Sequence, residues 1–113
     1  SAELILDRLK TLSGNMPVVV TGDFNVPPES EAYATMTSML VDSKLESVSE
    51  PHGPEGTFGG FTVKVDDTGD RIDYVFVAEG TKVLRYAALS DQWDGRYPSD
   101  HLPVLAEIIW PAP

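Results

Sequence analysis

Carboxylate, amide and imidazole side chains stand at the ends of apolar segments in this sequence: Asp23, Asn25, Asp73, Asp100 and His101. Carboxylate oxygens are the ligands that hard divalent cations prefer. A histidine beside a carboxylate keeps a high pKa and can donate a hydrogen bond to a phosphate oxygen. An asparagine amide can donate a hydrogen bond while accepting one from water. Together these residue types predict metal-assisted phosphoryl chemistry, in which a divalent cation and these side chains act on a phosphate ester.

Asp100 and His101 are neighbours, and Pro98 and Pro103 flank them. Each proline fixes its own φ angle and disfavours helix at the residue before it. The pair is therefore expected in an extended segment, at the start of the strand that follows. Because neighbouring residues of an extended chain point to opposite sides, the backbone must bend there, or the ligand must lie at the end of the strand, if both side chains are to act on one ligand.

Each of these residues also has a purely structural interpretation. The sequence Gly-Asp-Phe-Asn at residues 22–25 could form a turn, since Gly, Asp and Asn dominate turns. Asp73 interrupts an apolar segment, and a buried carboxylate needs a partner, for which Arg71 is a candidate. Asp100 and His101 could together cap a strand.

Two loop residues are candidates for substrate contact. His52 lies in a loop over residues 47–60, and Arg96 lies in a second loop over residues 90–98. The simpler expectation is that both are exposed and solvated, because loops run over the surface and isolated surface charges contribute little. Both loops are expected to border the site and to tune its specificity.

The elements that position these side chains follow from the apolar patterns. A stripe over residues 2–12 predicts an amphipathic helix, and a second helix is expected after Ser30, a suitable N-cap, with apolar positions at residues 32–40. Strands are predicted at residues 17–21, 71–78, 82–89 and 102–110, with a short strand that includes Phe58, Phe61 and Val63. This order indicates an α/β or α+β sheet covered on one side by helices.

The valine run at residues 18–20 is apolar on both sides, which is typical of a strand that is covered on both faces. Two helices cannot easily provide cover on both faces. The run is therefore a first indication that a partner layer is missing.

Composition narrows the class of protein. The chain of 113 residues has the length of a single domain, 42% of it is apolar, and it contains no cysteine, which excludes disulfides and thiolate metal sites. The net charge is −10, from 18 acidic and 8 basic residues. Because duplex binding depends on neutralising phosphates with Lys and Arg, extended nucleic-acid binding is not favoured. A local anion site remains compatible with this charge where a metal supplies positive charge.

Three stretches of the sequence together resemble a known family. They are residues 21–25 (Thr-Gly-Asp-Phe-Asn), 71–76 (Arg-Ile-Asp-Tyr-Val-Phe) and 99–104 (Ser-Asp-His-Leu-Pro-Val), with Gly-Thr-Phe at 56–58 before the second. Their order and spacing resemble the endonuclease/exonuclease/phosphatase family, of the deoxyribonuclease I-like superfamily. The resemblance implies that the chain is α/β (α+β), the C-terminal half of a four-layer α/β sandwich with a mostly antiparallel mixed sheet and helices on one face.

The resemblance also implies roles for the five residues in an enzyme that depends on Mg²⁺ (or Mn²⁺) and hydrolyses phosphodiesters or phosphomonoesters. Asp23 would position or deprotonate the attacking water, and Asn25 would bind the phosphate or the metal-bound water. Asp73 would orient His101 and keep it protonated, and His101 would stabilise charge in the transition state. Asp100 would bind the metal directly or through water.

The first half of the family's domain, with its principal metal-binding Glu, has no counterpart in residues 1–113. We therefore expect these residues to form the C-terminal half of a domain in a longer protein, with the missing N-terminal half and a phosphate-ester substrate as partners. The isolated segment is expected to bind metal weakly, to be nearly inactive, and to self-associate through its exposed sheet face. The alternative is a non-catalytic binding or scaffold module with the same fold, which would need none of the five polar residues. The substrate could be a nucleic acid, a phospholipid or a small phosphate ester.

Overall fold

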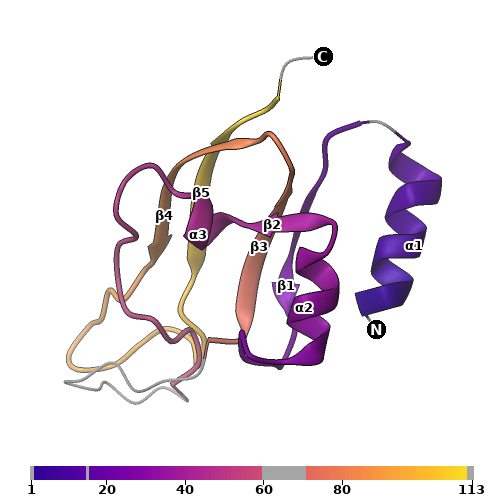
Figure 1. Cartoon of the computed structure of the whole chain (residues 1–113). Coiled ribbons are helices and arrows are strands. Elements are labelled where there is room, and N and C mark those ends of the chain that lie inside the picture. The colour runs from indigo at the N-terminus through magenta and orange to yellow at the C-terminus, as the bar shows by residue number, and fades with distance from the viewer. Residues whose placement is uncertain (1, 15, 60–70, 112–113) are drawn as a thin grey trace.

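The computed structural model describes residues 2–14, 16–59 and 71–111, and Figure 1 shows the order of the elements. These elements are α1 (Ala2–Ser13), β1 (Val19–Asp23), α2 (Glu31–Thr37), β2 (Leu40–Asp42), α3 (Ser43–Glu46), β3 (Asp73–Ala78), β4 (Lys82–Ala88) and β5 (Val104–Ile109). The helix and strand order predicted from the sequence is present, with β2 and α3 added. None of the helices in the described ranges is long and apolar enough to cross a membrane.

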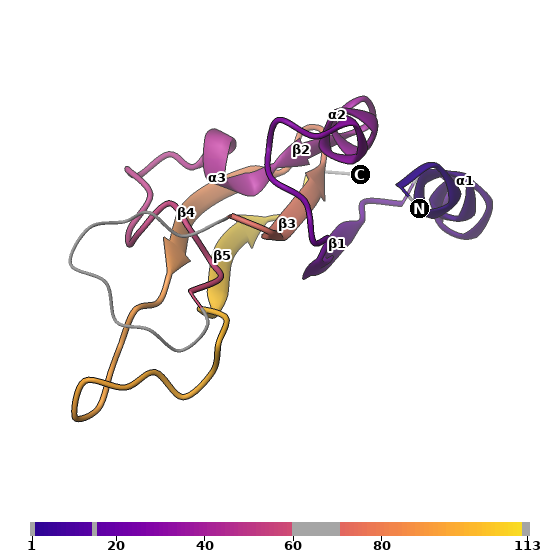
Figure 2. The same ribbon diagram turned by 90° about the horizontal axis from the view of Figure 1, so that it is seen from below.

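Strand β3 is the centre of the architecture. It pairs in antiparallel fashion with β1 on one side and β2 on the other, while β4 and β5 form a second antiparallel pair. Isolated parallel bridges join Ser47 to Val83 and His52 to Ala87, so the sheet is mostly antiparallel but mixed. Figure 2 shows α2 and α3 on the same side of the strands, with α1 beside β1.

The two faces of β3 bury different cores. Tyr74 and Phe76 pack against apolar side chains of α1 and α2, and Val75 and Val77 pack against side chains of β4 and β5. This alternation is the period-two pattern of a strand with apolar residues on both faces. Strand β3 is therefore held firmly from both sides, and it delivers Asp73 at its first position.

The second helix is shorter than predicted. Ser30 caps it as expected, since its hydroxyl accepts the N–H of Tyr33 at 3.1 Å, but the helix ends at Thr37 and residues 40–42 form β2. The hydroxyls of Thr35 and Thr37 bond to carbonyls one turn earlier, and side-chain bonds of this kind disfavour helix interiors. The apolar stripe continues past the helix because Leu40 is buried as part of a strand, with Ala78 as its partner on β3.

The valine run is predicted to need cover on both faces, and among the described residues it does not have that cover. Strand β1 begins at Val19, lies at the edge of the described three-stranded sheet, and leaves Val19 37% exposed. Leu105 and Ile109 on β5 are also about half exposed, at 47% and 51%. The apolar residues of these strands therefore exceed what the helices and strands of the described ranges cover. Of the predicted short strand at residues 58–63, Phe58 forms a bridge with His101, and Phe61 and Val63 lie outside the described residues.

Candidate active site

Asp23 and Asp73 meet at one end of the three-stranded sheet. The antiparallel register places Asp23, the last residue of β1, opposite Asp73, the first residue of β3. Residues directly opposite each other in such a pair project to the same face. Asp73 is 18% exposed and Asp23 is 36% exposed, so both carboxylates can reach solvent and a ligand.

His101 joins this pair from the segment that precedes β5. Its Nδ1 lies 2.7 Å from Asp73 Oδ2, and its Nε2 lies 3.7 Å from Asp23 Oδ2. The hydrogen bond to Asp73 raises the pKa of His101; burial opposes this shift, and the charges of the nearby aspartates add to it. With Nδ1–H donated to Asp73, Nε2 is turned toward Asp23 and the space beside it, where it can meet a phosphate oxygen.

The backbone bends just before His101, as a shared ligand site requires. The His101 N–H donates to the Ser99 hydroxyl at 3.1 Å, a local turn interaction. The Asp100 carbonyl accepts the N–H of Gly59 at 3.1 Å. Asp100 is half-buried, and within the described ranges the cluster of metal-ligating side chains contains Asp23, Asp73 and His101 without it. A metal-binding role for Asp100 stays a prediction.

Residues 22–25 form a turn, and the same turn positions a carboxylate of the site. The φ angle of Asn25, 55°, lies in the left-handed region that asparagine tolerates better than most residues. The N–H of Asn25 donates to Asp23 Oδ1 at 2.8 Å, while the N–H of Phe24 donates to the Ile72 carbonyl at 2.9 Å. The turn thus fixes one oxygen of Asp23 and leaves the other toward His101.

The suggested pairing of Asp73 with Arg71 is wrong. The Arg71 guanidinium bonds instead to both oxygens of Asp42 on β2, at 2.7 and 2.8 Å, and the Tyr33 hydroxyl donates to Asp42 at 2.7 Å. Burial alone would lower the pKa of Arg71, but the hydrogen bond and charge of Asp42 outweigh it and raise that pKa. Burial, with the Asp42 contact, raises the pKa of Tyr33 to about 12. Asp42 is only 2% exposed, so it competes strongly for the nearest cation.

A model of the Endonuclease/Exonuclease/phosphatase family matches residues 2–101. The chain belongs to this family. None of the curated proteins compared with the chain is similar enough to count as a match.

Solved structures agree with this assignment. An Enterococcus faecalis V583 protein described as functionally unknown is 35% identical with a TM-score of 0.86, and the match covers 97% of this chain and 46% of that one. A mannosyl-6-phosphatase of Bacteroides thetaiotaomicron VPI-5482 is 33% identical with a TM-score of 0.87, over 96% of this chain and 44% of that one. A family protein of Bacteroides vulgatus is 31% identical with a TM-score of 0.86, over 96% and 42%.

These matches confirm the predicted family and fold class, and they place the chain in a superfamily of phosphoesterases. The chain spans less than half the length of the three solved relatives. The two stretches that carry Asp23 and Asp73 lie within the family match, which ends at His101.

The two loop candidates are not brought to the cluster of Asp23, Asp73 and His101. Both side chains are exposed. His52 runs beside β4, where its N–H donates to the Tyr86 carbonyl at 2.9 Å, and Arg96 closes a turn with Trp93 through two backbone hydrogen bonds. Within the described part of the chain, no hydrogen bond or ion pair links either side chain to the cluster. Substrate contact by His52 or Arg96 remains a prediction.

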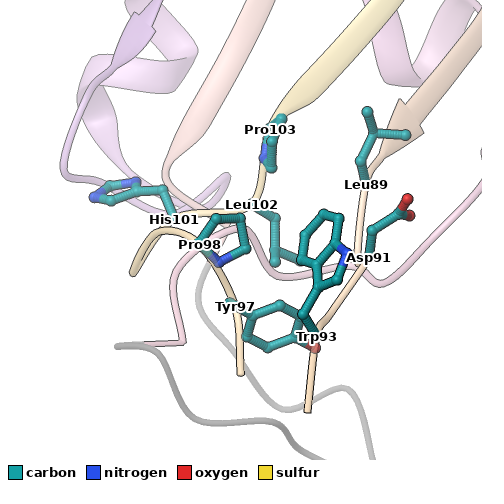
Figure 3. Close-up of a pocket in the computed structure, with 8 residues that line it drawn as sticks. All are labelled: Leu89, Asp91, Trp93, Tyr97, Pro98, His101, Leu102 and Pro103. Carbon is teal, nitrogen blue, oxygen red and sulfur yellow. The ribbon is translucent and has the colours of Figure 1, made fainter. Parts of the chain in front are cut away.

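A cavity of about 180 Å³ lies behind His101. The loop over residues 90–98, which is predicted to tune specificity, supplies part of its lining. Figure 3 shows the His101 ring pointing away from Trp93 and Tyr97, so His101 forms a wall of the cavity while its imidazole faces the aspartates. The full lining is Leu89, Asp91, Trp93, Tyr97, Pro98, His101, Leu102 and Pro103. The loop over residues 90–98 therefore borders the site from the side opposite the carboxylates.

The donor set fits a hard divalent cation. Ligand atoms of Asp23, Asp73 and His101 all lie within 4.8 Å of one another. Mg²⁺ is usually held by one or two carboxylates together with water and substrate phosphate, and seldom by an all-protein cage. His101 Nδ1 and Asp73 Oδ2 engage each other, so the remaining carboxylate oxygens of Asp23 and Asp73 are the hard ligand atoms that this cluster offers to the ion.

Proposed function

We propose that this chain carries part of the active site of a metal-dependent phosphoesterase, which cleaves a phosphomonoester or phosphodiester by attack of water. The observation that carries the proposal is the arrangement of Asp73, His101 and Asp23, with 2.7 and 3.7 Å between the paired atoms. Two carboxylates at one sheet end repel each other, and a scaffold would gain nothing from them. A bound cation together with an imidazolium would offset this repulsion.

In this proposal, each of the polar residues of the site has a separate role. Asp23 orients the attacking water and accepts its proton, since Oδ2 is left free of the turn that holds Oδ1. Asp73 holds His101 through Nδ1, so that the imidazolium presents Nε2–H to a phosphate oxygen and stabilises the charge that develops there. Asn25 donates its amide to the phosphate. A Mg²⁺ or Mn²⁺ ion, held in part by Asp100, would supply further positive charge and activate the water.

The remaining ligands lie, in this proposal, in the half of the domain that the solved relatives contain beyond the matched region. The chain covers only 42–46% of those relatives, and residues 1–113 would form the C-terminal half. That other half would cover the apolar residues that β1 and β5 leave exposed, such as Val19 and Leu105. The isolated chain would bind metal weakly, would hydrolyse little, and would self-associate.

The mannosyl-6-phosphatase relative acts on a phosphomonoester by its name, which favours a small phosphomonoester substrate here. The net charge of −10 also favours a small substrate, because a strongly acidic surface repels a long polyanion.

The test is hydrolysis of p-nitrophenyl phosphate and bis-p-nitrophenyl phosphate by the full-length protein, with Mg²⁺ or with EDTA. Asp23→Asn should lower kcat by about a hundredfold or more, the usual loss for a group that moves a proton in the reaction. Asp7→Asn, an exposed carboxylate on α1, is the matched control and should leave kcat unchanged. Full activity in EDTA, or in Asp23→Asn, would overturn the proposal.

A further inference from the structure

The contact between Asp73 and His101 joins residues 28 positions apart in the chain. Asp73 begins β3, whereas His101 lies in the bent segment before β5, outside any regular strand. Side chains alone do not hold such a contact at 2.7 Å, because each backbone must be fixed first. The short segment at residues 57–59 contacts both of them.

Toward Asp73, the contact comes from the side chain of Thr57. Its hydroxyl oxygen accepts the N–H of Ile72 at 3.0 Å and the N–H of Asp73 at 3.1 Å. Two consecutive backbone donors on one oxygen fix the peptide that leads into Asp73, just where β3 begins. Thr57 is completely buried, so water cannot replace this acceptor.

Toward His101, the contacts come from the backbone of the same segment. The Thr57 carbonyl accepts the N–H of Leu102 at 2.7 Å, and the N–H of Gly59 donates to the Asp100 carbonyl at 3.1 Å. These two bonds hold the residues on both sides of His101. The Phe58 ring lies edge-on to the imidazole, with 5.1 Å between the ring centroids.

We propose that Thr57 is the positioning residue of this site, because one residue fixes the backbone of Asp73 through its hydroxyl and the backbone after His101 through its carbonyl. Thr57 touches neither substrate nor metal in this role and acts only through the Asp73–His101 contact. The inference rests on the proposed function, since it assigns the part that Thr57 plays in that same site.

The simpler interpretation is that Thr57 is only a well-satisfied core residue. Thr81 is a matched control for that interpretation. It is also a buried threonine, at 7% exposure, but its hydroxyl has no hydrogen-bond partner among the described residues. A valine at position 81 therefore removes a buried hydroxyl without removing any of the bonds described above.

The experiment compares Thr57→Val, Thr57→Ser and Thr81→Val in the full-length protein, with kcat and KM for a nitrophenyl phosphate ester. Valine keeps the shape of threonine but loses the acceptor, so kcat should fall by about ten- to a hundredfold, as expected when a catalytic group is displaced by about an ångström, while KM changes little. Thr57→Ser keeps the acceptor and should stay within about threefold of wild type. Thr81→Val should match wild type.

Two further measurements separate positioning from folding. The ¹⁵N and ¹H resonances of the His101 Nδ1–H group, read at one fixed pH, should shift in Thr57→Val but not in Thr57→Ser or Thr81→Val. In a double-mutant cycle, Thr57→Val should add little to the loss already caused by Asp73→Asn, because both act on one contact.

The outcomes are distinguishable. The positioning role is overturned if Asp73→Asn impairs catalysis while Thr57→Val behaves like Thr81→Val, or if the two losses multiply independently. Should Thr57→Val fail to fold, a large fall of kcat in a folded Thr57→Ser protein would overturn it equally. A wild-type protein without hydrolytic activity defeats the proposed function, whereas the resonance of His101 still reports whether Thr57 controls the contact.

Discussion

Replacing Asp73 by Asn tests the central contact with almost no change of shape. The substitution removes the charge that faces His101 but keeps an oxygen able to accept the Nδ1–H. A hydrogen bond to a charged group contributes about 1.5–3 kcal/mol. Because His101 is 30% exposed and Asp73 18% exposed, we take the lower half of that range. At about 1.4 kcal/mol per factor of ten, kcat should fall by about ten- to fortyfold.

The pH dependence follows from the direction of the shift. The hydrogen bond to Asp73 is the main cause that raises the pKa of His101 above its ordinary value. Asp73→Asn should lower that pKa, so fewer molecules carry the imidazolium above neutral pH and the basic limb of the kcat profile moves to lower pH. A raised pKa in the folded state also stabilises the protein. That stability is fully present below the unfolded-state pKa, about 6.5, and is lost as pH rises through the folded-state pKa.

The assays are kcat–pH profiles and thermal unfolding curves of the full-length wild-type protein and its Asp73→Asn variant across the same pH range. The difference in Tm between wild type and Asp73→Asn should be largest near pH 5 to 6 and should narrow above it. The exposed carboxylate variant Asp7→Asn is the control for a general effect of lost charge. An unchanged basic limb, together with kcat within twofold of wild type, would refute the assigned role of Asp73.

Four further predictions concern stability, assembly and metal. Arg71→Met should cost about 3–5 kcal/mol in urea unfolding because it strands the buried Asp42, whereas adding Asp42→Leu should restore much of that loss; equal destabilisation of the single and double variants would contradict the buried-pair reasoning. Ser30→Ala should cost about 1 kcal/mol through loss of the N-cap, and no change would argue against it. The isolated chain should scatter light as an oligomer at micromolar concentration, and a monodisperse monomer would count against the exposed apolar face. Asp100→Ala should raise the Mg²⁺ concentration needed for half-maximal activity of the full-length protein by about tenfold or more, and an unchanged Mg²⁺ requirement would remove Asp100 from the metal site.

The main strands could be predicted because their signals are local. Apolar runs bounded by glycine, proline and aspartate located β1, β3, β4 and β5 to within a few residues. The positions of Asp23, Asp73 and His101 at segment ends follow from the same boundaries. The boundaries do not predict that these side chains meet. That depends on the register of β1 against β3, and apolar patterns leave the register open when both strands are apolar on two faces.

The interactions that the sequence did not reveal are non-local. Asp42 and Arg71 are 29 residues apart, and Asp42 lies just beyond the apolar positions of the predicted second helix. Leu40 satisfies both a helical period and a strand partner, so the pattern could not decide between them. Thr57 stands in the Gly-Thr-Phe stretch that resembles the family, but the sequence does not show that its hydroxyl accepts two backbone N–H groups from a segment 15 residues further along the chain.

The placement of Arg71 explains why the carboxylate of Asp73 is available to His101. The two residues are only two positions apart, and a direct pair would occupy carboxylate oxygens of Asp73 and place a second cation beside the imidazole. Asp42 prevents this, because a carboxylate that is only 2% exposed needs a hydrogen-bonding partner, and it binds Arg71 through both oxygens. The rings of Tyr74 and Tyr86 lie 4.8 and 5.8 Å from the guanidinium carbon and favour the cation at that position. The buried ion pair with Asp42 thus holds Arg71 away, and the carboxylate of Asp73 is left to His101.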